Sequence, residues 1–124
     1  MDTHTISNAE LQQVLSLFKD VAEGWTGGPW TWDGRFAVPV SIVRPPFTDI
    51  ALDHLRAVMP FEFDSTAHSH LPDQLASVCA RSGGLRPGQL AFCDTVHPAG
   101  GLRYCLWWPW NSGGTASLRI GLTG

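Results

Sequence analysis

The sequence predicts an α+β fold in which two or three helices pack on an antiparallel sheet of four or five strands. Apolar residues recur at helical spacing in the first two thirds of the chain, and the spacing changes to two from Gln89 onward. Short turn sequences join the last alternating segments, which favours a C-terminal three-stranded meander. With 124 residues and no long linker or repeat, residues 1–124 are expected to form one domain.

The first helix is predicted over about residues 8–23. Ser7 to Glu10 has the Ser-x-x-Glu pattern of a capping box, and apolar residues then recur every three or four positions until Gly24.

Two further helices follow. Thr48 can cap a helix whose apolar face continues until Pro60 ends it. Asp73 lies near the start of another, which ends before Gly83.

The other segments are predicted strands. Residues 35–42 alternate, with Phe36, Val38, Val40 and Ile42 expected on the buried side. Because proline cannot donate a hydrogen bond to a neighbouring strand, Pro39 favours an edge position. A short strand is expected at residues 61–63. The meander strands are the alternating segments at residues 90–93, 102–108 and 117–122.

Placing the apolar residues of the meander on one side fixes its register, since a one-residue shift turns a strand over. In the second hairpin this pairs Trp108 with Leu118 inside and Trp107 with Arg119 outside.

In the first hairpin, the same argument pairs Phe92 with Leu106 inside and Cys93 with Cys105 outside. A two-residue shift keeps the same faces but separates the two cysteines. The three cysteines are odd in number and lack C-x-x-C spacing, which indicates reduced thiols and a cytoplasmic protein.

Tryptophan gives the main functional signal. Trp107, Trp108 and Trp110 lie within four residues, so their rings cannot all enter one core. The predicted outer face carries Arg103, Trp107 and Arg119, with Trp110 at the hairpin mouth, and this surface suits stacking and cation-π contacts. In the alternative, a helix covers this face and Trp107 belongs to the core.

A second platform is predicted near the glycine-rich segment. Trp30 and Trp32 share strand parity and could stack side by side, with Asp33 and Arg35 as polar partners. In the alternative, these rings seal the first helix against the sheet. The segment lacks the glycine spacings of phosphate-binding loops, and no cofactor is predicted.

Two sets of residues suggest chemistry. Asp94, His97 and Tyr104 could form an acid-base set at one end of the sheet, or could simply belong to a hairpin turn. Asp64, His68 and His70 contain an H-x-H pair that could bind zinc, nickel or iron, but a solvated loop is the favoured interpretation. We therefore predict neither a catalytic nor a metal site.

The net charge of -3 and the pI near 5.9 argue against nucleic acid or an anionic membrane as partner. No stretch approaches the roughly 20 apolar residues of a membrane span. The favoured hypothesis is a small non-catalytic binding protein, such as an inhibitor or a bacterial toxin-immunity protein, that binds a protein partner through a Trp/Arg surface. The other hypothesis is a small-molecule enzyme or carrier with an aromatic pocket.

Overall fold

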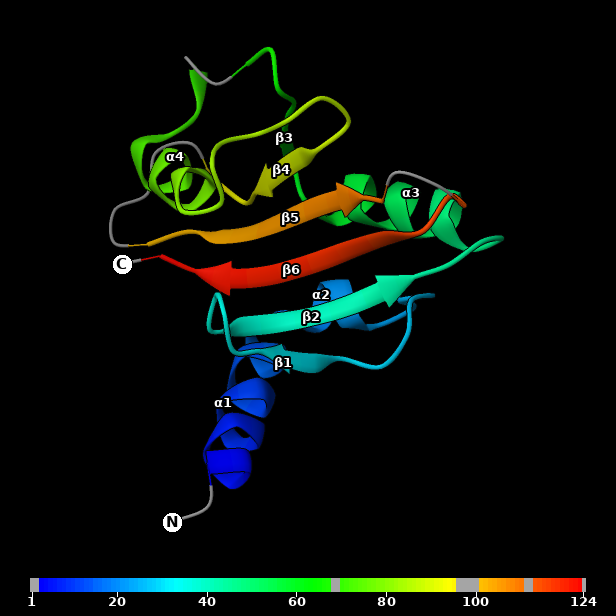
Figure 1. The fold of residues 1–124 in the computed structure, drawn as a ribbon, viewed down its shortest axis with the longest axis vertical. Coiled ribbons are helices and arrows are strands. Elements are labelled where there is room, and N and C mark those ends of the chain that lie inside the picture. The colour runs from blue at the N-terminus through cyan, green and yellow to red at the C-terminus, as the bar shows by residue number, and fades with distance from the viewer. Residues whose placement is uncertain (1–2, 68–69, 96–100, 111–112, 124) are drawn as a thin grey trace.

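In the computed structural model, the described residues form a six-stranded antiparallel sheet and four α-helices (Figure 1). The structure describes residues 3–67, 70–95, 101–110 and 113–123, with side chains from residue 8 onward. The elements are α1 Thr3–Leu17, α2 Lys19–Ala22, β1 Thr31–Asp33, β2 Val38–Val43, α3 Thr48–Val58, β3 Phe61–Phe63, α4 Asp73–Ala80, β4 Leu90–Cys93, β5 Arg103–Pro109 and β6 Ala116–Leu122. The predicted α+β class is confirmed, with one more helix and one more strand than expected.

The sheet has the strand order β1-β2-β6-β5-β4-β3. Its central strands β4, β5 and β6 form the predicted meander. β2 was expected at an edge, but β1 pairs beyond it, with Trp32 opposite Pro39. The buried residues of β2 also include the set opposite to the predicted one: Pro39, Ser41 and Val43 are fully buried.

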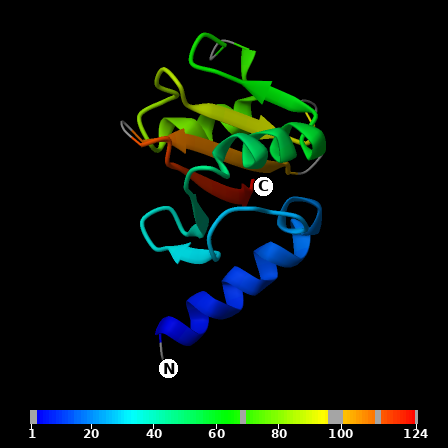
Figure 2. The same cartoon turned by 90° about the vertical axis from the view of Figure 1, so that its right-hand side faces the viewer.

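The N-terminal helix differs from its prediction. α1 begins at Thr3, so the Ser7 to Glu10 sequence lies inside the helix instead of at its start. Phe18 leaves the helical conformation, with φ of −119° and ψ of 36°, and the chain continues as the single turn α2. This break accompanies complete burial of Phe18 and Val21. α1 extends beyond the β1 edge of the sheet toward the N-terminus (Figure 2).

The other two helices agree with their predictions. α3 buries Ala51 and Leu55 against the sheet. Thr48 does not cap it, because its hydroxyl donates to the Gly114 carbonyl at 2.8 Å and links α3 to the β5–β6 hairpin. After α4, Gly84 adopts a φ of 86°, which glycine tolerates without strain.

Both meander hairpins are shifted by one residue from the predicted registers. Trp107 lies opposite Leu118, and Trp108 lies opposite Ser117. The shift exchanges the faces of β5, so Trp107 is only 4% exposed. The predicted open position of Trp107 is therefore wrong, and the alternative that a helix covers it is correct.

In the first hairpin, Phe92 lies opposite Cys105 and Cys93 lies opposite Tyr104. Cys93 and Cys105 therefore point to opposite faces and are not cross-strand neighbours. All three cysteines are free and buried. Burial raises the pKa of Cys79 and Cys93 to about 11, so these thiols stay protonated near neutral pH.

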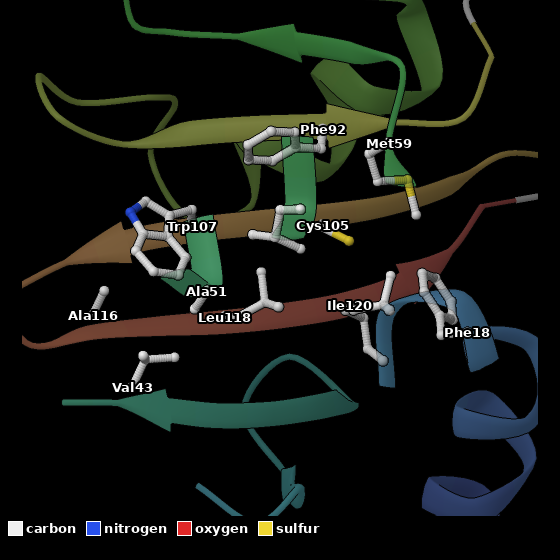
Figure 3. Packing of buried hydrophobic residues seen from close by; sticks show 12 residues of the cluster. Phe18, Val43, Ala51, Met59, Phe92, Cys105, Trp107, Ala116, Leu118 and Ile120 are labelled. Atoms are coloured by element: carbon white, nitrogen blue, oxygen red, sulfur yellow. The ribbon is translucent and has the colours of Figure 1, made fainter. Parts of the chain in front are cut away.

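The sheet carries a different layer on each side. On the side that we call the covered face, α2 and α3 pack over a core that includes Phe92, Cys105, Trp107, Leu118 and Ile120 (Figure 3).

The opposite side, which we call the half-open face, is covered by α4 over β3, β4 and β5. Its core is formed by Leu75, Val78, Cys79, Ala91, Cys93, Leu102, Tyr104 and Leu106. No described helix lies over β6, β2 and β1 on this side (Figure 1).

Candidate binding groove on the half-open face

A groove of about 490 Å³ lies on the half-open face, beside the region that α4 covers. We call it the Arg/Trp groove. It is lined by Asp33, Arg35, Phe36, Ser82, Arg86, Gln89, Trp108, Trp110, Ser117 and Arg119. These residues come from the β1–β2 turn, from the segment between α4 and β4, and from the neighbouring ends of β5 and β6.

Arg119 is the most constrained cation of the groove. Its Nε donates to Asp33 Oδ2 at 2.8 Å, and its Nη1 donates to Ser117 Oγ at 2.8 Å. The guanidinium carbon lies 4.2 Å from the centroid of the Trp108 ring, which is cation-π geometry. These three contacts orient the Arg119 guanidinium in the absence of a ligand, and 17% of its side chain is exposed.

The β1–β2 turn packs against Arg119 and Trp108. Asp33 Oδ1 accepts the backbone N–H of Arg35 at 2.9 Å and that of Phe36 at 3.4 Å. Ala37 follows with a φ of 55°, a left-handed conformation that turns the chain back into β2. Phe36 then contacts Trp108 edge to face, with ring centroids 5.5 Å apart. One carboxylate therefore orders both Arg119 and the turn.

The Asp33 carboxylate is stabilised in its charged form. Burial alone would raise its pKa, but the hydrogen bond from Arg119 and the two backbone N–H groups outweigh this effect. The net result is a lowered pKa, so Asp33 is ionised at neutral pH and its charge balances that of Arg119.

Arg35 and Arg86 line the same groove and are exposed. Neither forms an ion pair with another described residue. The Arg35 guanidinium lies 5.0 Å from the Phe36 ring centroid, and the Arg86 backbone N–H donates to Gln89 Oε1 at 2.9 Å. With one carboxylate among three arginines, the groove is positive, although the whole chain has a net charge of -3.

Trp110 lies at the mouth of the β5–β6 hairpin, as predicted, and is 52% exposed. Its backbone N–H donates to the Thr115 carbonyl at 2.8 Å, which anchors the residue at the end of the ladder. Trp110 also lines a neighbouring hollow whose other residues include Pro45, Leu52 and Pro109. One exposed indole therefore borders both a cationic and an apolar depression.

Arg103 was predicted beside Trp107 on an open face, but it contacts the helices instead. Its Nε donates to Asp94 Oδ2 at 3.1 Å, and its Nη1 donates to Asp20 Oδ1 at 2.9 Å and to the Leu17 carbonyl at 3.0 Å. Its guanidinium carbon lies 5.3 Å from the Phe18 ring centroid. Arg103 thus joins the junction of α1 and α2 to the sheet.

The predicted platform of Trp30 and Trp32 is replaced by a different pair. Trp30 stacks on Trp25, with centroids 5.7 Å apart and planes 27° apart, and both pack against the core of the covered face. Trp25 Nε1 donates to Ser41 Oγ at 3.0 Å. Trp32 pairs with Pro39 and does not line the groove. The alternative that rings seal the helical layer to the sheet describes Trp25 and Trp30 best.

The predicted acid-base set is not assembled. Asp94 binds Arg103 on the covered face, whereas Tyr104 lies on the half-open face over Gly121, so the two side chains point away from each other. Burial raises the pKa of Tyr104, which disfavours its use as a base. His97 lies outside the described residues.

Only part of the predicted metal set can be located. Asp64 accepts hydrogen bonds from the Thr66 backbone N–H at 2.9 Å and the Thr66 hydroxyl at 2.6 Å. His70 is exposed, and His68 lies outside the described residues. Across the described ranges, no group of three His, Cys, Asp or Glu side chains is placed to hold a metal ion.

Sequence reasoning identified Arg119 and Trp110 but assigned Trp108 to the core. It also overlooked Arg86 and Phe36 as site residues. The signal present was the Asp-Gly-Arg turn after Trp32, which places a carboxylate near a strand end. Nothing local in the sequence links this turn to Arg86, because the two meet only through the order of strands in the sheet.

Comparison with known proteins gives no match: no family model, curated protein or solved structure is similar to this chain at a significant level. Within the described part of the chain, no helix has the length and apolar character needed to cross a bilayer.

Proposed function

We propose that this chain is a non-catalytic binding protein that recognises a protein partner through the Arg/Trp groove and Trp110. An inhibitor or a toxin-immunity protein would act in this way. The main support for this proposal is that Arg119 is fixed against Trp108, while Trp110 in the same groove is half exposed.

The composition and the order of the groove favour a protein partner. Tryptophan and arginine are enriched among the residues that contribute most to protein interfaces. A side chain that is already ordered also loses little conformational entropy when a partner binds, so the fixed Arg119–Trp108 pair lowers the cost of association.

The groove adjoins the part of the half-open face that no described helix covers, which gives a protein partner room to contact β2 and β6 from this side. Ile42 and Val40 of β2 are partly exposed on this side, and a partner can bury them.

A small-molecule ligand is the second candidate. The volume of about 490 Å³ falls within the range of roughly 300–1,000 Å³ that small-molecule pockets occupy. Three aromatic side chains and several polar side chains line the groove, and such groups can orient a ligand.

The test is quantitative recovery of a partner from the cell of origin, using the full chain as bait in three forms: wild type, Trp110→Ala and Leu122→Ala. Leu122 is 45% exposed but does not line the groove, so it controls for loss of an exposed apolar side chain. We expect a stoichiometric protein that Trp110→Ala loses and Leu122→Ala retains. A partner retained by both variants would contradict the proposal.

The same preparations distinguish the second candidate. If the ligand is a small molecule, native mass spectrometry of the wild-type protein should show one adduct per chain and no protein partner. The Trp110→Ala variant should lack this adduct.

A further inference from the structure

We propose that Arg35 and Arg86 bind the carboxylates of an acidic segment of the partner, with Arg119 as a fixed positioning residue beneath them. This inference rests on the proposed function and names the chemistry that its partner must have.

The arginines of the chain divide by their partners. Arg119 is neutralised by Asp33, Arg103 by Asp20 and Asp94, and Arg56 by Glu62. Four arginines, Arg35, Arg44, Arg81 and Arg86, form no ion pair with another described residue. Of these four, Arg35 and Arg86 line one groove. Two cations that lack a counterion within the same depression are favourably placed to bind an anion.

The surroundings strengthen this attraction. The ring of Trp108 and the neutral Asp33–Arg119 pair form a base in which water has little access, since the side chains of Asp33 and Arg119 are 13% and 17% exposed. An ion pair formed over such a surface is less screened than one in open solvent. Gln89 Oε1 already accepts the Arg86 backbone N–H, so its NH₂ group is the end that can donate to a carboxylate.

The geometry favours acidic side chains over a phosphate group. Phosphate sites commonly use backbone N–H groups at a helix N-terminus. Ser82, by contrast, follows the C-terminal end of α4, where the helix presents carbonyls, and its hydroxyl donates to the Cys79 carbonyl at 2.9 Å. The cations are side chains from two separate loops, so an extended acidic segment can meet both arginines.

The test is isothermal titration of the purified full chain with hexaglutamate, hexaglutamine and inorganic phosphate at low salt. The variants are Arg35→Gln, Arg86→Gln and the double variant, with Arg44→Gln as the matched control. Arg44 is exposed and lies outside the groove. Circular dichroism establishes that each variant is folded.

We expect hexaglutamate to bind and hexaglutamine not to bind. The double variant should lose about tenfold in affinity or more, each single variant less, and Arg44→Gln less than about twofold. Added salt should weaken the binding, because the arginines are exposed.

The inference would be overturned by no hexaglutamate binding by the wild type, by unchanged affinity in the double variant, or by an equal loss in Arg44→Gln. Saturable phosphate binding that needs both arginines would assign the groove to a free anion instead. These titrations use only the purified chain and model anions, so their failure would not bear on whether the chain has a protein partner. Partner recovery that depends on Trp110 but not on Arg35 or Arg86 would refute this inference alone.

Discussion

Trp107 and Trp108 are neighbours on β5 but belong to different parts of the molecule. Trp107 is 4% exposed and packs under the helices of the covered face, whereas Trp108 lies partly exposed beneath Arg119 on the half-open face. Strand alternation alone produces this division. Side chains on the covered face therefore contribute mainly to stability, whereas the uncovered part of the half-open face leaves side chains exposed to a partner.

Arg103 and Arg119 also differ between the covered face and the half-open face. Arg103 bonds two carboxylates and a carbonyl at the helix junction, so its charge is used inside the fold. Arg119 bonds Asp33 and Ser117 at the floor of a groove. Both are paired, and the Arg119 pair shares its groove with Arg35 and Arg86, which form no ion pair with another described residue.

The largest expected effect concerns the two tryptophans. Trp107→Ala should lower the free energy of unfolding by about 3–5 kcal/mol, because it removes a buried ring and leaves a cavity. Trp108→Ala should cost distinctly less, since its ring is partly exposed. Urea denaturation measures both, and equal losses would remove the contrast between the faces.

The next effect concerns the helix junction. Arg103→Gln should lower the free energy of unfolding by about 1–3 kcal/mol, because the Asp20 and Asp94 carboxylates lose a charged donor. Hexaglutamate affinity should not change. A variant as stable as the wild type would show that this ion-pair network does not hold the α1–α2 junction.

Acidification should affect the two faces through Asp20 and Asp33. Hydrogen bonding by Arg103 lowers the pKa of Asp20, and at Asp33 the bonds from Arg119 and the turn N–H groups outweigh burial. Both folded-state pKa values lie below the ordinary 3.8, so this stabilisation is complete above that pH and is lost as pH falls through the lowered values. Denaturation at several pH values should show a smaller acid loss in Asp33→Asn, and an unchanged profile would contradict this.

The smallest stability effect is expected at Trp110. Trp110→Ala should change the free energy of unfolding by less than about 0.5 kcal/mol, because the ring is half exposed. Partner binding should still weaken by about 2 kcal/mol or more. A large loss of stability would place Trp110 among the structural residues.

The sequence was sufficient for the helices α3 and α4 and for the three meander strands, because each has clear periodicity and end signals. The sequence did not predict the correct pairing register of the two hairpins, because β5 is covered on both sides. Leu106 faces α4 and Trp107 faces α3, so both parities of the strand are apolar and alternation no longer marks one buried face. The buried side of β2 was predicted wrongly for a similar reason. Ser41 is buried because it is hydrogen-bonded to Trp25 and to the Gly28 carbonyl, and the sequence gives no sign of these partners.

The candidate site could be predicted only in part. An exposed Trp110 follows from the crowding of three indoles in four residues. The groove depends on the packing of Phe36 onto Trp108 and on Arg86 reaching the same depression from a distant loop. Those contacts follow from the strand order and the correct register, which local spacing does not specify.

The most direct test follows the indole N–H signals of the six tryptophans by NMR during titration with hexaglutamate, after assignment with single Trp→Phe variants. If binding takes place on the half-open face, the chemical shifts of the Trp108 and Trp110 indole N–H signals should change. Those of Trp107 and Trp25, on the covered face, should not. Movement of Trp107 or Trp25 instead, with Trp108 and Trp110 unchanged, would contradict the assignment of binding to the half-open face.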